Sequence, residues 1–411
     1  VVENGIIKEV GSTILKSGKY VEIDCEGGVI LPSFIELYNE INTPASATDY
    51  KSYQNRAPEY AWNEAIMPER LASQFSHLDK SDVNQWYKMG FGVLHNVPNN
   101  GIIAGQSYLR GLHSTDHHSS FLKDQIALSL SFQKGTSKQA YPSSQMGSIA
   151  LLRQTFYDAK WFGNGVNRPA NISLEALNDA QKRLMFFKVN DANEILRAEK
   201  IAKEFDLNAV YIGGGDEYKI AQELKNQGAK VVLPLHFPKA YNVTDPYLNQ
   251  YIPLSELKHW EIAPANANLV KQNGVSFALS SKGVANEKEL WTNIRASIKH
   301  GLTIPEALQA LTETPAKWLG IDKEYGSLEV GKKAFFTLYS ANPFLQDADV
   351  LEVMNNYGRI LLKSKSVENL EGKYHVQVDG KQFVLEISKK NNNYEAKRIE
   401  VTAKNLEKVK L

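Results

Sequence analysis

Cysteine is almost absent from this 411-residue chain, since Cys25 is the only one. A single cysteine excludes an internal disulfide and a zinc site built on cysteines. Nine histidines remain as possible metal ligands. No apolar run reaches the ~18 residues that a membrane-spanning helix needs. The net charge of +1 gives no field to attract nucleic acid or an anionic membrane surface, which argues against those partners.

An initiator methionine is also missing, because the chain starts VVENGIIKEV, within a strand-like pattern. We therefore expect a processed or partial chain from which a leader has been removed. This expectation favours the periplasm or cell envelope as its location. Hydrophobic content of 43% and charged content of 23% are ordinary for a soluble globular protein.

Two patterns alternate between Leu31 and about residue 325. Short apolar runs predict buried strands, and these are FGVLHNV, QIALSLSF, LMFFKV, AVYIGG, KVVLPLHF and VSFALSS. Between them lie the helix-period segments ANEILRAEKIAKEF and DEYKIAQELKNQG, the second ending at Gly228, where a helix C-cap belongs. Buried strands alternating with amphipathic helices are typical of parallel β/α units. Six or more units favour an α/β fold of the closed (β/α)8 TIM-barrel type.

The two ends of the chain have the pattern of short strands instead. Asn4-Gly5 is a two-residue hairpin signal between apolar runs. After Gly326 the runs GSLEVGKKAFFTLYS and GKYHVQVDGKQFVLEIS again alternate. We expect residues 1–30 and 326–411 to build a small β-sandwich around a barrel of residues 31–325. The polar, Lys-rich stretch from Asn391 is expected to be a tail.

One further helix is predicted from Ile304, in IPEALQALTETPAKWLG. Its apolar face comprises Ala307, Leu308, Leu311 and Trp318. Pro315 is expected to break this helix, because proline removes a backbone donor and clashes with the preceding turn.

Several of these segments resemble the amidohydrolase superfamily, in its imidazolonepropionase-like and prolidase-like branch. GGVILPSFIEL resembles that family's barrel entry, MFFKVNDANEILRAEKIAKEF its fifth strand and helix, and AVYIGGGDEYKIAQELKNQGAKVVLP its sixth. VSFALSSKG resembles the end of the eighth strand, and HGLTIPEALQALTETPAKWLGIDKEYGSLEVGKKAFF the C-terminal signature. PEYAWNEAI and YPSSQMGSIALLRQTFYDAKW resemble a Bacteroidetes-type subgroup. The resemblance implies a barrel with a β-sandwich, and hydrolysis of C–N bonds in amide or peptide-like substrates by one or two divalent metals, usually zinc.

The metal-ligand positions implied by this resemblance hold other residue types. The first-strand His pair aligns with Tyr38 and Glu40, and the fifth-strand His with Lys188. The sixth-strand His aligns with Gly213, and the eighth-strand Asp with Lys282. A lysine ammonium donates hydrogen bonds and accepts none, so it cannot bind a metal while charged. We therefore expect no metal and no other cofactor.

A charge cluster is our hypothesis for what replaces the metal. Buried charge is costly unless it is paired, so Glu40 is expected to face Lys188 and Lys282 beside Tyr38. The alternative is that one or both lysines point outward and pair with nothing.

His95 and His236 are the other candidates, because each is expected near a strand end. With Glu40 they would form a rebuilt metal site. We favour the interpretation that each is a polar residue satisfied by backbone at the barrel rim. The sequence GGGDE, from Gly213 to Glu217, lacks the spacing of a phosphate-binding loop and is interpreted as a tight strand-to-helix turn.

Three functional hypotheses follow. The chain is a catalytically silent amidohydrolase-like module paired with an active relative, in a second domain or subunit. Alternatively, it is an active hydrolase that has a rebuilt metal site or uses Lys188 or Lys282 with Glu40 as base or nucleophile. As a third hypothesis, it binds a small molecule in a pocket beside Tyr38, Gly213, His95 and His236. An open pocket with a lysine free of carboxylate partners favours the enzyme, and a plugged barrel mouth favours the silent module.

Overall fold

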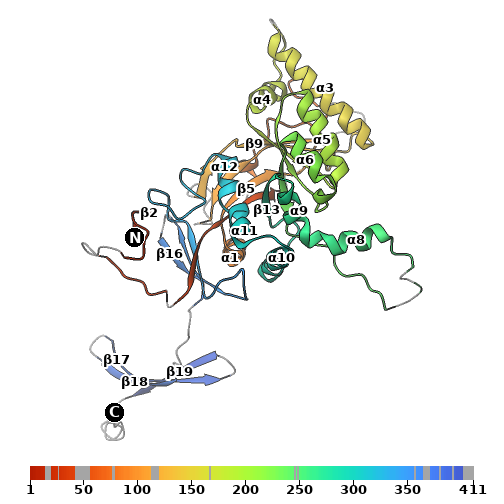
Figure 1. Cartoon of the computed structure of the whole chain (residues 1–411). Coiled ribbons are helices and arrows are strands. Elements are labelled where there is room, and N and C mark those ends of the chain that lie inside the picture. The colour runs from red at the N-terminus through yellow and green to blue at the C-terminus, as the bar shows by residue number, and fades with distance from the viewer. Residues whose placement is uncertain are drawn as a thin grey trace. The chain divides into compact units, whose positions relative to one another are not determined.

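The computed structural model describes residues 1–13, 20–25, 27–41, 56–75, 79–112, 120–165, 168–244, 247, 250–355, 358–363, 371–378, 381–390 and 393–400. The chain divides into two compact units, Val1–Leu362 and Lys363–Leu411. Figure 1 labels their helices and strands. The first unit mixes helices and strands, and the second consists of strands among its described residues.

Six strands of the first unit form one sheet, in the order β13-β12-β11-β10-β9-β6. Their bounds are β6 Ile103–Gln106, β9 Ala127–Ser131, β10 Leu184–Lys188, β11 Asn208–Ile212, β12 Lys230–Pro234 and β13 Ser276–Ser280. Strands β9 to β13 are parallel, and β6 is antiparallel to β9. The parallel strands are those predicted from their apolar runs.

A second sheet has the order β4-β5-β7-β8, with β4 parallel to β5. Its bounds are β4 Phe34–Ile41, β5 Phe91–Pro98, β7 Tyr108–Gly111 and β8 Phe121–Lys123. One buried apolar cluster joins Leu37 and Val93 of this sheet to Phe186 and Val232 of the larger sheet. The predicted mixed α/β class is therefore confirmed. No closed sheet occurs among the described residues, so closure into a (β/α)8 barrel stays a prediction.

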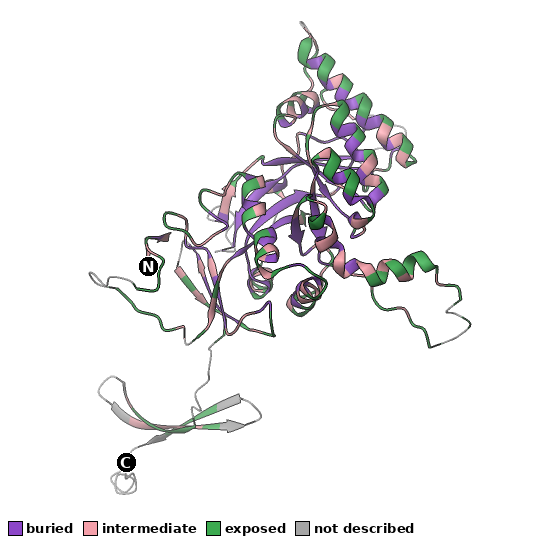
Figure 2. Ribbon diagram, in the orientation of Figure 1, coloured by how far each residue is buried: buried purple, intermediate pink, exposed green. Residues whose placement is uncertain are grey.

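The first unit also contains helices, several of which bury one apolar face. They are α1 Lys80–Met89, α3 Gln145–Asn164, α4 Ile172–Ala180, α5 Ala192–Glu204, α6 Ala221–Gln227, α8 Leu254–Ile262, α9 Asn266–Gln272, α10 Glu287–Lys299, α11 Ile304–Leu311 and α12 Glu313–Leu319, with 3-10 turns η1 Ala72–Gln74, η2 Glu217–Ile220 and η3 Ala263–Ala265. Figure 2 shows α3 and α5 buried on one side and exposed on the other.

No helix in the described part of the chain is both long and apolar enough to cross a membrane.

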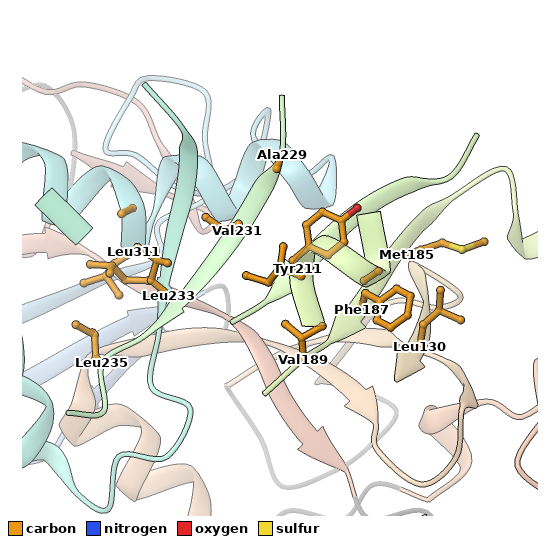
Figure 3. Packing of buried hydrophobic residues seen from close by; sticks show 14 of the residues in the cluster. Leu130, Met185, Phe187, Val189, Tyr211, Ala229, Val231, Leu233, Leu235 and Leu311 are labelled. Carbon is orange, nitrogen blue, oxygen red and sulfur yellow. The ribbon is translucent and has the colours of Figure 1, made fainter. Parts of the chain in front are cut away.

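Both faces of the larger sheet are buried, which explains why its strands are continuous apolar runs. Met185, Phe187, Tyr211 and Leu233 lie in the main core cluster (Figure 3). The alternating residue Phe186 belongs to the other cluster, as expected from the two-residue period of a strand.

The predicted helix break at Pro315, between α11 and α12, is wrong. The break between them lies at Thr312, whose backbone has φ −132° and ψ −74°, and not at Pro315. Pro315 lies in the first turn of α12, where the missing N–H has no helical partner to lose. Ala307 and Leu311 of the predicted apolar face are buried.

The chain ends form small antiparallel sheets. Strands β1 Val2–Glu3 and β2 Ile6–Ile7 make the predicted hairpin, and Asn4 and Gly5 have φ of 52° and 74°. A four-stranded sheet has the order β16-β15-β14-β3, from β3 Val29–Pro32, β14 Phe336–Tyr339, β15 Val350–Asn355 and β16 Gly358–Leu361. Residues from both ends of the first unit thus share one sheet. The boundaries at residues 30 and 325 stay a prediction.

In the second unit, β17 Gly372–Val378, β18 Lys381–Lys390 and β19 Asn393–Glu400 form an antiparallel sheet. The predicted tail is therefore wrong for residues 393–400. Cross-strand pairs stabilise β19 despite its polarity. Lys397 lies opposite Glu386, and the Arg398 guanidinium lies 4.6 Å from the centre of the Phe383 ring. The rest of that predicted tail, 401–411, lies outside the described residues.

Candidate functional site

The predicted site residues gather at one edge of the sheets. Parallel strands place their carboxyl ends at a common edge, which is where ligands bind in such folds. Lys188 is the last residue of β10, Gly213 follows β11, and Lys282 lies two residues beyond β13. Tyr38 and Glu40 lie near the end of β4.

An ion pair joins Glu40 to Lys188 across this edge. Lys188 Nζ lies 2.6 Å from Glu40 Oε1, with 24% and 32% of the two side chains exposed. Asn99 Nδ2 donates to Glu40 Oε2 at 3.3 Å. Burial acts to raise the pKa of Glu40, but the hydrogen bond and charge of Lys188 outweigh it and hold that pKa below its usual value.

Lys282 takes a different partner. Its Nζ donates to the Gly213 carbonyl oxygen at 2.9 Å and lies 5.9 Å from the centre of the Tyr38 ring. Burial first, and then the positive charge of Lys188, lower the pKa of Lys282. Both Lys282 and Glu40 are described residues, and no ion pair forms between them. The expected contact of Glu40 with both lysines is thus present for Lys188 alone.

Tyr38 lies beside these charged groups. Its side chain is buried, and its hydroxyl makes no hydrogen bond of good geometry to any described residue. Burial, followed by the nearby negative charge of Glu40, raises the pKa of Tyr38 well above its ordinary value. Tyr38 therefore remains a neutral phenol at the centre of the cluster.

Glu217 joins the cluster, although sequence reasoning did not identify it. Its fully buried carboxylate accepts hydrogen bonds from Gly215 N at 3.0 Å and Asn266 Nδ2 at 2.6 Å. A Cβ on Gly213 would lie 1.7 Å from Glu217 Oε1, so the carboxylate fills the space that a side chain at position 213 would need. Burial raises the pKa of Glu217. The only indication of it in the sequence was that an acidic residue, Glu217, follows closely after the three glycines.

Glu36 is the second buried carboxylate that sequence reasoning missed, within FIEL of β4. Its Oε1 accepts hydrogen bonds from Ser280 Oγ at 2.6 Å and Tyr38 N at 2.8 Å. Its Oε2 accepts from Ser281 N at 2.8 Å and Ser281 Oγ at 2.6 Å. Glu36 therefore connects β4 to the end of β13 and positions Tyr38 and Lys282 relative to each other. The only indication of Glu36 in the sequence was an acidic residue placed between apolar residues.

His95 lies inside β5 and is fully buried. Its Nδ1 lies 2.8 Å from the Leu37 carbonyl oxygen and its Nε2 lies 2.6 Å from Ser107 Oγ. Burial lowers the pKa of His95 to about 4, so the ring is neutral near pH 7. Both nitrogens have protein partners, which leaves neither for a ligand.

His236 follows β12, and its side chain is 47% exposed. Its Nδ1 lies 3.7 Å from Glu289 Oε1, and its ring packs against Gly283, where an added Cβ would lie 3.0 Å from Cγ. His236 and Glu40 contact different partners, so the structure does not bring together His95, His236 and Glu40.

A divalent metal does not fit the donors at this edge. The aligned positions present two ammonium groups, a neutral phenol, a glycine and one carboxylate that is already paired. Ammonium groups cannot donate electron pairs to a metal while charged, and two of them would repel a dication. Within the described ranges, no group of three or more His, Cys, Asp and Glu side chains is arranged to hold an ion.

This chain is similar in sequence and in fold to known proteins. Residues 215–381 match the sequence model of the amidohydrolase family. No curated protein matches the chain. An amidohydrolase from Thermotoga maritima MSB8 has a similar structure, with a TM-score of 0.68 and 22% identity over 88% of this chain and 94% of that one. A prolidase complexed with N-methylphosphonate-L-proline matches with a TM-score of 0.50 and 14% identity over the same shares, 88% and 94%. Residues 215–381 are thus similar to the amidohydrolase family, and the fold of the chain resembles the folds of these two structures.

Proposed function

We propose that this chain is an amidohydrolase-like module in which an ion-pair cluster has replaced the metal centre. It acts as a silent partner of an active relative, in a second domain or subunit, rather than as a hydrolase of C–N bonds. The observation that carries the proposal is the 2.6 Å contact between Lys188 Nζ and Glu40 Oε1. The ammonium group in this contact belongs to the residue that the resemblance aligns with a metal-binding histidine.

The charges of the cluster support this proposal. Lys188 neutralises Glu40, which is the one aligned position that retains a possible metal ligand. Lys282 donates to the Gly213 carbonyl oxygen and carries a second positive charge at the same edge. Glu217 fills the space above Gly213, so the sixth-strand position has no room for a histidine without a shift of that carboxylate.

The fold proposal rests on the contacts of Glu36. We propose that residues 31–325 form a (β/α)8 barrel closed between β4 and β13, where Glu36 accepts hydrogen bonds from Ser280 and Ser281. Residues 1–30 and 326–362 supply the accompanying β-sandwich, since residues from 363 onward belong to the second unit. The resemblance to a Bacteroidetes-type subgroup and the periplasmic or cell-envelope location remain part of this proposal.

A second candidate function comes from Lys282. This lysine is partly buried and makes no ion pair with any described carboxylate, and burial and the charge of Lys188 lower its pKa. A lysine with these properties is a base or nucleophile at lower pH than an ordinary one. Reaction with a carbonyl probe followed by borohydride reduction would label Lys282 in this case. If Lys282 is reactive, mass spectrometry should detect more adduct on the wild-type protein than on the Lys282→Met variant. Equal amounts on both proteins would show that Lys282 is not reactive.

Hydrolysis assays test the silent-module proposal. The purified chain is incubated with zinc or manganese and assayed on dipeptides ending in proline and on cyclic amides, beside an active prolidase as positive control. We expect no rate above buffer for this chain. Turnover that is abolished by Glu40→Gln would contradict the proposal and support catalysis by the cluster.

The partner role is tested separately. An active amidohydrolase-like protein from the same organism is mixed with this chain at equal concentration. We expect a complex by analytical ultracentrifugation, with a raised melting temperature for the active protein. Two separate sedimenting species at micromolar concentration would contradict the partner role.

A further inference from the structure

A second cavity lies beside helices α3 and α4 and shares no lining residue with the cluster at the carboxyl ends. Its volume is about 450 Å³, within the range of ~300–1,000 Å³ that is usual for small-ligand pockets. The lining contains three aromatic residues, Tyr60, Trp62 and Trp161, one acidic residue, Asp158, and one basic residue, Arg56. The kind of ligand that this cavity can bind therefore depends on which of the two charged side chains already has a partner of opposite charge.

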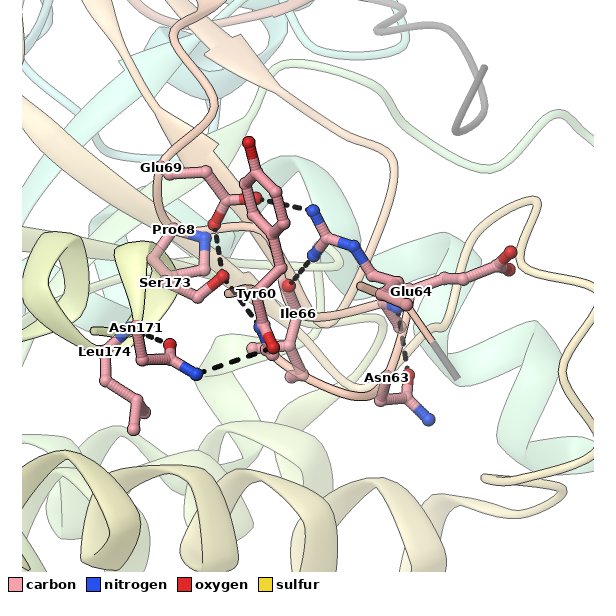
Figure 4. A network of polar contacts seen from close by, with 12 residues as sticks. Tyr60, Asn63, Glu64, Ile66, Pro68, Glu69, Asn171, Ser173 and Leu174 are labelled. Atoms are coloured by element: carbon pink, nitrogen blue, oxygen red, sulfur yellow. Dashed lines mark hydrogen bonds and ion pairs between the residues drawn. The ribbon is translucent and has the colours of Figure 1, made fainter. Parts of the chain in front are cut away.

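Arg56 is balanced by partners in the protein. Its Nη2 donates to Glu69 Oε1 at 2.8 Å, and its Nη1 donates to the Ile66 carbonyl oxygen at 2.8 Å. Ser173 Oγ donates to the other Glu69 oxygen at 2.8 Å. Figure 4 shows this network, with Glu69 and Ser173 side by side. The guanidinium is thus neutralised within the wall of the cavity.

The same wall holds the aromatic residues in place. Asn171 Nδ2 donates to the Tyr60 carbonyl oxygen at 3.5 Å, and Ala61 N donates to Ser173 Oγ at 2.9 Å (Figure 4). The Trp62 ring stacks on Tyr141, with centroids 6.1 Å apart. Pre-ordered walls lower the entropy cost of binding a ligand.

Asp158 is not balanced in this way. It accepts one hydrogen bond, from Gln154 Nε2 at 2.7 Å. No described cation forms an ion pair with it. Burial raises the pKa of Asp158, which is the direction expected for a carboxylate that lacks a counter-ion. The indoles of Trp62 and Trp161 are 43% and 65% exposed, so their surfaces are open to a ligand.

We propose that this cavity binds a small organic ammonium ion, held by the carboxylate of Asp158 and the indoles of Trp62 and Trp161. Aromatic faces attract cations, and tryptophan does so best. An anionic ligand would be repelled by Asp158, and a neutral ligand would leave that charge uncompensated. The inference is independent of the function proposed for the cluster at the carboxyl ends.

Calorimetric titration with choline tests the charge requirement. The comparison ligand is the uncharged isostere of choline, in which carbon replaces the ammonium nitrogen. We expect choline to bind at least about tenfold more tightly, because the cation–π and ion-pair contacts are available only to the charged ligand. Equal affinities, or no choline binding at millimolar concentration, would overturn the proposal.

Variants locate the site. Asp158→Asn and Trp161→Ala are each expected to weaken choline binding about tenfold, with no change for the neutral isostere in Asp158→Asn. Trp161 is largely exposed, so its replacement leaves the core intact. Glu261→Gln and Trp260→Ala, on α8 and outside the cavity, are matched controls. Equal weakening in the control variants would show that binding occurs elsewhere and overturn the assignment.

Discussion

Lys188 Nζ and Glu40 Oε1 are 2.6 Å apart, although the two residues come from different sheets, β10 and β4. The pair therefore links the carboxyl ends of both sheets at the edge where this kind of fold binds its ligands. Because the pair is partly buried, removing one partner should cost more than in an exposed ion pair and less than in a fully buried one.

Glu40→Gln is expected to lower the free energy of unfolding by about 1–2 kcal/mol at neutral pH, because Lys188 loses its counter-ion. The folded pKa of Glu40 lies below its ordinary value of 4.5, so the stabilisation is present above pH 4.5 and is lost as pH falls through the folded pKa. Urea unfolding of both proteins at neutral and acidic pH measures this. Glu3→Gln, which removes an exposed pair at 3.9 Å from Lys8, is the control and should cost nothing measurable.

Lys282→Met tests the cost of burying that ammonium group. The folded pKa of Lys282 lies below its ordinary value of 10.5, so the unfolded state binds more protons between the two values. The wild-type protein should therefore gain stability relative to Lys282→Met as pH rises through this window. Unfolding curves at neutral pH and at pH near 10.5 give the difference. A difference that is constant with pH would mean that Lys282 is not perturbed.

Glu36→Gln is expected to destabilise the fold by about 3 kcal/mol. The amide nitrogen would face a donor, either Ser281 N or a serine hydroxyl, and leave it unsatisfied in the core. Ser281→Ala removes one donor and should cost about 1 kcal/mol. Thermal and urea unfolding rank the two variants. An equal cost for both would show that Glu36 does not connect β4 to β13 as described.

His95 predicts a loss of stability in mild acid. Its folded pKa of about 4 lies below the ordinary 6.5, so its contribution is present above pH 6.5 and is lost as pH falls toward 4. His95→Gln should unfold with a weaker pH dependence over this range. NMR detection of the His95 ring gives a direct check, and protonation near pH 6.5 would contradict the prediction.

Parts of the fold could be predicted because local pattern and burial agree. The run LMFFKV of β10 is apolar since both faces of its sheet are covered, and Gly228 ends α6 with φ 64°. The Glu40–Lys188 contact followed from charge balance at aligned positions. Each of these depends on nearby residues or on one simple electrostatic rule.

Other parts depend on contacts that no local pattern encodes. Glu217 turns back onto Gly213 because Asn266, far along the chain, donates to its carboxylate. Lys282 binds the Gly213 carbonyl oxygen rather than Glu40 because the loop after β11 presents that oxygen. A polar segment such as 393–400 becomes a strand through its cross-strand partners on β18.

The central claim is that ammonium groups occupy the place of the family's metal. The most direct measurement is elemental mass spectrometry of the purified chain after equilibration with trace zinc, manganese and iron. We predict a metal content far below one ion per chain, with no change on Glu40→Gln. One tightly held ion per chain, lost in Glu40→Gln, would contradict the account and restore metal-dependent hydrolysis as the working activity.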